Sequence, residues 1–180
     1  IVGSGAFVRY VIAEAVNDQD LKVLLTGEGG DETFGGYTAS YAAYLYDKLT
    51  SFEWITAVKE AWQMPEPLRA IKGALFFSLP QTVQEPLLRR RVQHRRDELN
   101  ASLPIPMEHK LSLYDAQSLN DYLVNTAEKG ILPRLLNYND KMAMAHGVES
   151  RSPILDTAIT QLGRGLNADT KVKDGYSKHI

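Results

Sequence analysis

Apolar residues near the start of the chain recur at helical spacing. Val8, Val11, Ile12 and Ala15 fall on one face of a helix that is predicted from about residue 7 to residue 17. The pattern then changes to a short continuous apolar run in "LKVLLTG", residues 21–27. Such a run is typical of a strand buried on both faces, as in parallel sheets. The sequence therefore predicts a helix followed by a buried strand.

A glycine-rich turn follows the predicted strand, and helical periodicity resumes from about Tyr37. In α/β folds, ligand sites lie beyond the carboxyl ends of parallel strands. The order of helix, strand, glycine-rich turn and helix therefore makes this turn the first candidate for a site.

The rest of the chain is predicted to be almost entirely helical. Proline residues separate several of the helices, and proline is tolerated in the first turn of a helix. Asp156 is expected to cap a further helix in "SPILDTAITQL". The stretches "ASLPIPMEHK" and "NADTKVKDG" are expected to be polar or linker-like loops. The helical patterns cover residues 40–49, 52–63, 67–79, 83–99, 113–128 and 132–145.

A single buried parallel strand is too little for a complete α/β domain, because such a strand needs neighbours on both sides. Outside residues 23–25 the sequence offers no other convincing strand. Two interpretations follow. Either the fold is all-helical and "KVLLT" is not a strand, or the remaining strands lie upstream of this chain.

Composition narrows the class of protein. The chain has 180 residues, of which 44% are hydrophobic and 23% charged, and its formal net charge is −2. These values indicate a globular domain and disfavour nucleic acid as the main partner. Cysteine is absent, which excludes disulfides, thiolate catalysis and cysteine-bound zinc and favours a reducing cytoplasm. No stretch approaches the roughly 20 apolar residues of a membrane span, and the start does not resemble a signal peptide.

Three acids stand among five glycines in "LLTGEGGDETFGGY", residues 24–37. An ordinary tight turn could explain both residue types, since Gly and Asp dominate turns. The density of glycines directly after a strand instead favours a backbone that approaches a ligand closely. The turn is not a Walker A loop, because no Lys-Ser or Lys-Thr follows the glycines, and it is not G-x-G-x-x-G, because Glu32 stands where the third glycine belongs. Carboxylates beside a phosphate would be explained by a magnesium ion between them.

The second candidate segment is "YNDKMAMAHGVESRSPILD", residues 138–156. Its methionines are best explained as core. Asp140, Lys141, Glu149 and Arg151 form two acid/base pairs that flank an apolar stretch, and they either make a structural ion-pair network or line a pocket. We expect Arg151 to be partly buried and paired with a carboxylate, because burial without a partner would be costly.

The most basic stretch is "LLRRRVQHRR", residues 87–96. Its apolar residues fall on one helical face and its arginines mostly elsewhere, which indicates a solvated helix face. Nucleic-acid binding is poorly supported, because aromatic residues are not interleaved with the basic ones.

Two stretches, "VLLTGEGGDETFGGY" and "NDKMAMAHGVESRSPILD", together resemble the signatures of the synthetase domain of glutamine-hydrolysing asparagine synthetases. Their order and the long helical insert between them fit as well, so the resemblance spans nearly the whole chain. It implies an α/β fold of the adenine-nucleotide ATP-pyrophosphatase type. It also implies Mg·ATP-dependent adenylation of the aspartate side chain, followed by attack of glutamine-derived ammonia on β-aspartyl-AMP.

The resemblance also implies roles for residues of the acidic turn. Thr26, Gly27, Gly29 and Gly30 would lie along the adenylate. Glu28 would accept the surplus proton of the attacking ammonia. Asp31 would contribute to magnesium binding. Glu32 is expected to face solvent or to lie at the start of the next helix, where its charge suits the helix dipole.

Three departures from the family pattern matter. The pyrophosphate loop S-G-G-x-D-S is absent, since "VGSGAF" does not match it, and the cysteine-bearing glutaminase domain is absent too. The lysine that typically meets pyrophosphate would lie beyond Ile180, which makes Lys178 a flanking residue. Residues 1–180 are therefore expected to be the C-terminal part of a synthetase domain, and inactive in isolation. Asp31 and the segment 140–151 are expected to share one cleft.

Two other interpretations stay open. A β-lactam synthetase-like or peptide-cyclising ligase would also adenylate a carboxylate, although Glu28 favours ammonia because β-lactam synthetases typically carry tyrosine there. A non-catalytic helical module is the alternative from a different class. In the leading interpretation the partners are aspartate, ATP and ammonia, with neither nucleic acid nor membrane, and the full-length protein is a homodimer in the cytoplasm.

Overall fold

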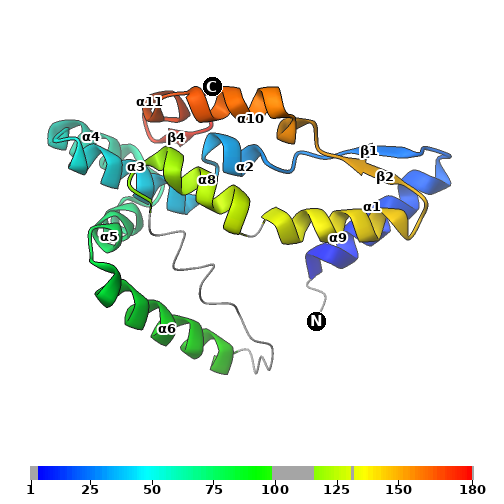
Figure 1. The fold of residues 1–180 in the computed structure, drawn as a ribbon, viewed down its shortest axis with the longest axis horizontal. Helices are drawn as coiled ribbons and strands as arrows, with labels where there is room; N and C mark the ends of the chain where they lie inside the picture. Colours follow the sequence, from blue (N-terminus) through cyan, green and yellow to red (C-terminus); the bar gives the residue numbers. More distant parts are fainter. Residues whose placement is uncertain (1–3, 99–115, 131, 180) are drawn as a thin grey trace.

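The computed structural model describes residues 4–98, 116–130 and 132–179. These residues are mostly helical, with four short strands (Figure 1). The helices are α1 Ser4–Asp18, α2 Gly30–Phe34, α3 Thr38–Thr50, α4 Trp54–Gln63, α5 Pro67–Phe77, α6 Gln81–Glu98, α8 Leu119–Lys129, α9 Leu132–Met144, α10 Thr157–Gly165 and α11 Ala168–Lys171, with a 3-10 turn η1 at Pro153–Leu155. The strands are β1 Val23–Leu25, β2 Glu149–Arg151, β3 Val172–Lys173 and β4 Tyr176–Ser177.

The predicted helices form where their local signals place them. Pro67 stands in the first turn of α5, and the Asp156 carboxylate accepts a hydrogen bond from the Ala158 N–H at 2.8 Å at the start of α10. The expectation of an Asp156 cap is thus confirmed. The predicted loop "ASLPIPMEHK" lies outside the described residues.

The apolar run at residues 23–25 is indeed a strand, but its partner has no apolar pattern. β1 pairs in parallel with β2, and the register joins Leu24 to Ser150. The expectation that the chain holds no second convincing strand was therefore wrong. The expectation of burial on both faces was also wrong, since Val23 is 43% and Leu25 66% exposed. A pair of strands covered from one side only cannot bury both of its faces.

The main core lies around α3. Tyr44 and Leu45 of α3 are buried with residues of α5 and α8, among them Phe77 and Leu119. α3 and α5 cross closely, because a Cβ on Gly73 would lie 2.5 Å from the Ala42 Cβ. This helical half forms the left part of the molecule in Figure 1.

A second, smaller core lies beside the strand pair. Ala13 of α1, Ala143 of α9 and Val148 are buried there, with Leu24 of β1 packed against them. α1 and α9 thus lie against the same side of β1 and β2 (Figure 1). This packing places the carboxyl ends of both strands next to α9 and the start of α2.

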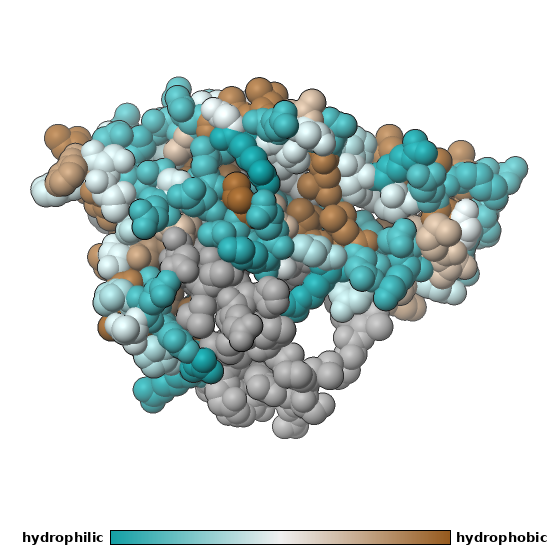
Figure 2. Space-filling model, viewed as in Figure 1, coloured by the Kyte–Doolittle hydropathy of each residue, from teal (hydrophilic) through white to brown (hydrophobic). Residues whose placement is uncertain are grey.

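Apolar side chains remain at the surface at both ends of the view in Figure 2, over α4 and near α1 and β1. On α1, Phe7 is 67% exposed, and on α4, Ile55 is 89% exposed. Over the described residues, no helix is both long enough and apolar enough to cross a membrane.

The stretch 167–175 is not the polar loop that the sequence predicts. α11 and the antiparallel hairpin of β3 and β4 occupy it and the residues that follow. Asp174 and Gly175 both have positive φ, 49° and 80°. Two adjacent residues of this kind make the hairpin turn that Asp-Gly favours.

Lys171, the last residue of α11, is 1% exposed and donates a hydrogen bond to the side-chain oxygen of Asn120 on α8. Burial lowers the pKa of Lys171 to about 8. From about pH 8 to about pH 10.4, the unfolded chain therefore holds a proton that the folded chain has released. Stability then rises with pH across this window.

We expect the free energy of unfolding to increase by about 2 kcal/mol between pH 8 and pH 10, and Lys171→Met to remove this slope. Urea unfolding at a series of pH values measures it. Lys173→Met is the control, because Lys173 lies two residues further along the chain, in β3, and is exposed. A slope that persists in Lys171→Met would contradict the assignment.

Candidate functional site

The carboxyl ends of β1 and β2 are joined beyond the last strand residues. The Thr26 N–H donates a hydrogen bond to the Arg151 carbonyl at 2.8 Å, and the Thr26 and Ser152 hydroxyl oxygens lie 2.9 Å apart. The acidic turn and the segment "SRSPILD" therefore leave the sheet side by side, although more than a hundred residues separate them in sequence.

Gly29 and Gly27 occupy different surroundings within the acidic turn. Gly29 has φ 91° and is buried, and a Cβ there would lie 2.6 Å from the Leu155 Cγ of η1. Gly30, also buried, begins α2. Gly27 is exposed, and a Cβ there would meet no atom within 4 Å. Gly29 is therefore needed for the close packing of the turn against η1. The backbone at Gly27 is instead accessible at the surface of the turn.

Glu28 points into a cleft formed by α1, β1, β2 and α9. Its Oε1 accepts a hydrogen bond from Arg9 Nη2 at 2.7 Å and another from Asn139 Nδ2 at 3.3 Å. The Glu28 side chain is 18% exposed. Among the described residues, no donor contacts its other oxygen, Oε2. The carboxylate is thus held by one oxygen, and the second is available to a ligand.

The cleft has a volume of about 550 Å³, within the range of small-molecule sites. Its walls are apolar side chains of α1 and β1, and its polar groups come from the two strands and their ends, from Arg9 of α1 and from Asn139 of α9. The residues that line it are Gly5, Val8, Arg9, Ile12, Leu24, Leu25, Thr26, Glu28, Asn139, Ala143 and Ser150.

Asp31 is not among the residues that line this cleft. Its carboxylate pairs with Lys178 Nζ at 2.6 Å, and both side chains are about half exposed. Gly36 makes room for the pair, since a Cβ there would lie 2.8 Å from the Asp31 Cγ. The expectation that Asp31 shares a cleft with residues 140–151 is therefore not met by this cleft, where Glu28 takes that place.

Glu32 was expected either to face solvent or to lie at the start of the next helix, and the structure bears out the second alternative, since Glu32 lies in the first turn of α2 and not at the surface. Glu32 is 4% exposed, and its Oε1 accepts a hydrogen bond from the Tyr37 hydroxyl at 2.6 Å. Burial and this hydrogen bond raise the pKa of Tyr37 above its ordinary range. Glu32 thus ties α2 to the start of α3.

The two acid/base pairs of the second segment do not line the cleft. Asp140 and Lys141 are exposed on α9. Arg151 pairs with Glu149 through two hydrogen bonds of 2.9 and 3.2 Å, but both side chains are more than half exposed. The expected carboxylate partner of Arg151 is confirmed, whereas its expected burial was wrong. The guanidinium lowers the pKa of Glu149, chiefly through its hydrogen bonds.

Comparison with known protein families finds a match to asparagine synthase over residues 1–180. The chain belongs to the asparagine synthase family. It is 28% identical over 206 residues to "Amidase chry2" of Gibberella zeae, covering 96% of this chain and 30% of that protein. It is also 28% identical over 200 residues to "Amidase chyE" of Penicillium rubens, covering 92% of this chain and 29% of that protein.

The chain thus spans about 30% of the length of these curated relatives. No solved structure matches it.

In this member of the asparagine synthase family, sequence reasoning missed three residues that contact the acidic turn. Arg9 and Asn139 hold Glu28, and Lys178 contacts Asp31 instead of merely flanking the site. Asn139 is next to Asp140 in the "YNDK" motif, so its place in the sequence could have identified it as a candidate site residue. Arg9 carried a weaker signal, as the one basic residue within the apolar first helix.

The acidic turn could supply only some of the ligands of a magnesium ion. Among the described residues, no three His, Cys, Asp or Glu side chains gather closely enough to hold a metal by themselves. Magnesium commonly takes one or two protein carboxylates and completes its shell with phosphate oxygens and water. The half-exposed Asp31 suits such a contribution.

Proposed function

We propose that this chain is part of an ATP-dependent amide-forming ligase that activates a carboxylic acid as its adenylate and transfers the acyl group to ammonia. Membership of the asparagine synthase family supports the reaction class. The observation that carries the proposal is the Glu28 carboxylate, which faces a cleft at the carboxyl ends of two parallel strands with Oε2 left open. Ligands of α/β sheets bind at such strand ends.

In the finer form of the proposal the acid is aspartate, the product is asparagine and the ammonia comes from glutamine. Thr26 and the open backbone of Gly27 would contact the adenylate. Asp31 would contribute one carboxylate to a magnesium ion that offsets the charge of the leaving pyrophosphate. The expected glutaminase domain and the S-G-G-x-D-S loop would belong to other parts of a longer polypeptide.

Glu28 would act when ammonia attacks. As the nitrogen forms its bond to the carbonyl carbon, AMP leaves and the nitrogen carries a surplus proton. Glu28 Oε2 would accept that proton, while Arg9 and Asn139 hold Oε1 and so fix the direction of the carboxylate. Asp140, Lys141, Glu149 and Arg151 would support the surrounding surface without touching the acid.

Exposed apolar surface beside the strands supports the proposal that further strands belong to the domain. Val23 and Leu25 on β1 and Phe7 on α1 are 43%, 66% and 67% exposed. Parallel strands are normally covered on both faces. The helices that connect further strands of an ATP-pyrophosphatase-type sheet would supply that cover.

Pyrophosphate release tests the proposal. We expect the full-length polypeptide to release pyrophosphate from Mg·ATP only when the acid is present, and to form amide when ammonium is added. We expect the 180-residue chain alone to do neither, because it lacks the backbone N–H groups that a phosphate loop supplies. Turnover by the chain alone would contradict its placement as a partial domain, and no ATP use by the full-length protein would contradict the ligase.

A second candidate function is amide hydrolysis, because both relatives are named amidases. Assays on the same full-length polypeptide distinguish the ligase from the amidase. A ligase consumes ATP and forms amide, whereas an amidase releases ammonia from an amide with no ATP added.

A further inference from the structure

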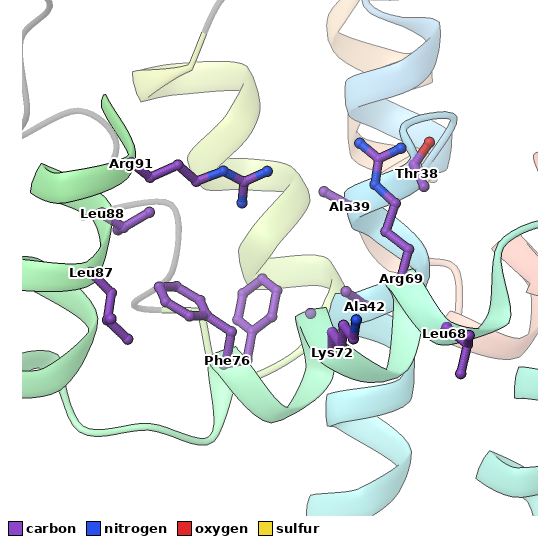
Figure 3. A pocket seen from close by; sticks show the side chains of 12 residues that line it. Thr38, Ala39, Ala42, Leu68, Arg69, Lys72, Phe76, Leu87, Leu88 and Arg91 are labelled. Carbon is purple, nitrogen blue, oxygen red and sulfur yellow. The ribbon is translucent and has the colours of Figure 1, made fainter. Parts of the chain in front are cut away.

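A second and larger cavity lies in the helical half, between α3, α5 and α6 (Figure 3). Its volume is about 690 Å³. The cleft that holds Glu28 shares none of its lining residues, so the two are separate sites. A concave space of this size on three helices suits a small molecule.

The floor and one wall of this cavity are apolar. Phe76 and Phe77 come from α5, and Leu87 and Leu88 come from α6. Ala42 of α3 closes the far side, where only small side chains leave room. An apolar body would therefore be buried against aromatic and aliphatic side chains, which is favourable in proportion to the area removed from water.

The charged side chains that line the cavity among the described residues are all basic. Arg69 and Lys72 come from α5, and Arg91 comes from α6. Figure 3 shows Arg91 extending from α6 toward the space above Phe76, and Arg69 rising beside α3 near Thr38. None of the described residues that line the cavity is acidic.

Ion pairing leaves much of this charge uncompensated. Arg69 pairs with Glu66 at 2.8 Å outside the lining, whereas neither Lys72 nor Arg91 pairs with a carboxylate among the described residues. Arg89, two residues from Arg91, does pair with Glu85. Like charges around an apolar space repel one another, so an anion placed between them would relieve the repulsion and gain charge-assisted hydrogen bonds.

We propose that this cavity binds a free organic acid, with an apolar chain or ring against Phe76 and Leu87 and a carboxylate between Arg91 and Lys72. Arginine favours this assignment, because its planar guanidinium matches a carboxylate with two parallel hydrogen bonds. The arginine run predicted to be a solvated helix face is exposed at Arg89, Arg90 and Arg91, and of these three only Arg91 also lines the cavity.

Calorimetric titration of the protein with decanoate tests this proposal. We expect saturable binding that weakens as salt is added, and decanol should bind at least about tenfold more weakly because it lacks the charge. Lys72→Met and Arg91→Met should each raise the dissociation constant about tenfold, since each removes one charged partner and keeps most of the apolar stem.

Arg90→Met and Lys59→Met are the matched controls, because both residues are exposed and neither lines the cavity. They should leave the dissociation constant within about twofold. Leu87→Glu gives an independent check. Leu87 is 47% exposed, so the change is compatible with folding, and its carboxylate should displace decanoate. Circular dichroism confirms that each variant is folded.

Three outcomes of the titrations would overturn the proposal. They are no decanoate binding at millimolar concentration, equal binding of decanol and decanoate, and equal effects of Arg90→Met and Arg91→Met. Co-sedimentation with anionic phospholipid vesicles in the absence of decanoate binding would also overturn it, in favour of a membrane surface. None of these measurements depends on the activity of the proposed ligase. The organic-acid site and the ligase function can therefore be contradicted independently of each other.

Discussion

Replacing Glu28 by glutamine is expected to lower amide formation by the full-length protein about 10²- to 10⁴-fold, the range of general acid–base contributions. Glutamine keeps the shape of the side chain and can still accept a hydrogen bond from Arg9 Nη2 through its amide oxygen. It cannot take the proton that ammonia releases on attack. Acid-dependent pyrophosphate release should fall far less, because activation of the acid precedes that proton transfer.

Glu149→Gln is the matched control for this experiment. Glu149 undergoes the same chemical change in the same part of the molecule, but it is exposed at the start of β2 and does not line the cleft. Glu32 cannot serve, because it is buried against Tyr37 and its replacement would disturb the fold. If Glu28→Gln and Glu149→Gln reduce amide formation alike, Glu28 is not the proton acceptor.

Gly29→Ala is expected to lower the free energy of unfolding by about 3 kcal/mol, and Gly27→Ala by less than about 0.5 kcal/mol. At Gly29 a side chain would have to adopt φ 91° and would also collide with Leu155. At Gly27 neither obstacle exists, since a Cβ there meets no atom within 4 Å. Urea unfolding of both variants measures the difference.

The same two variants separate packing from ligand binding. Gly27→Ala should fold normally and still weaken ATP binding in the full-length protein, because the added methyl group stands where the proposed adenylate approaches the backbone. Equal losses of stability in the two variants would show that Gly29 is not held against η1. Unchanged ATP binding in Gly27→Ala would remove Gly27 from the proposed adenylate contacts.

Local signals predicted most of the helices. Proline in the first turn of α5 and the Asp156 cap of α10 act within a few residues, so the sequence alone shows them. The Asp-Gly signal of the β3–β4 hairpin was equally local, at residues 174 and 175. It was missed because each strand has only two residues and no alternating pattern precedes it.

β2 had no local signal at all. Glu149, Ser150 and Arg151 are a strand because β1 lies beside them and offers its backbone hydrogen bonds. That pairing depends on α1 and α9 packing together, so it is decided by contacts between distant parts of the chain. A pattern of apolar and polar residues cannot report such a contact.

The sequence by itself determined which turn bears the acids and glycines, and its motifs indicated the family to which the chain belongs. Only the tertiary structure decided what each acid does. Glu28, Asp31 and Glu32 lie within five residues, yet one faces a cleft, one pairs with Lys178 and one is buried against Tyr37. Their chemistry is nearly identical, and the difference arises from the partners that folding brings to each carboxylate. The partners of Glu28 and Asp31 come from α1, α9 and residue 178, which no spacing within the turn could specify, whereas Tyr37 stands at the end of the turn itself.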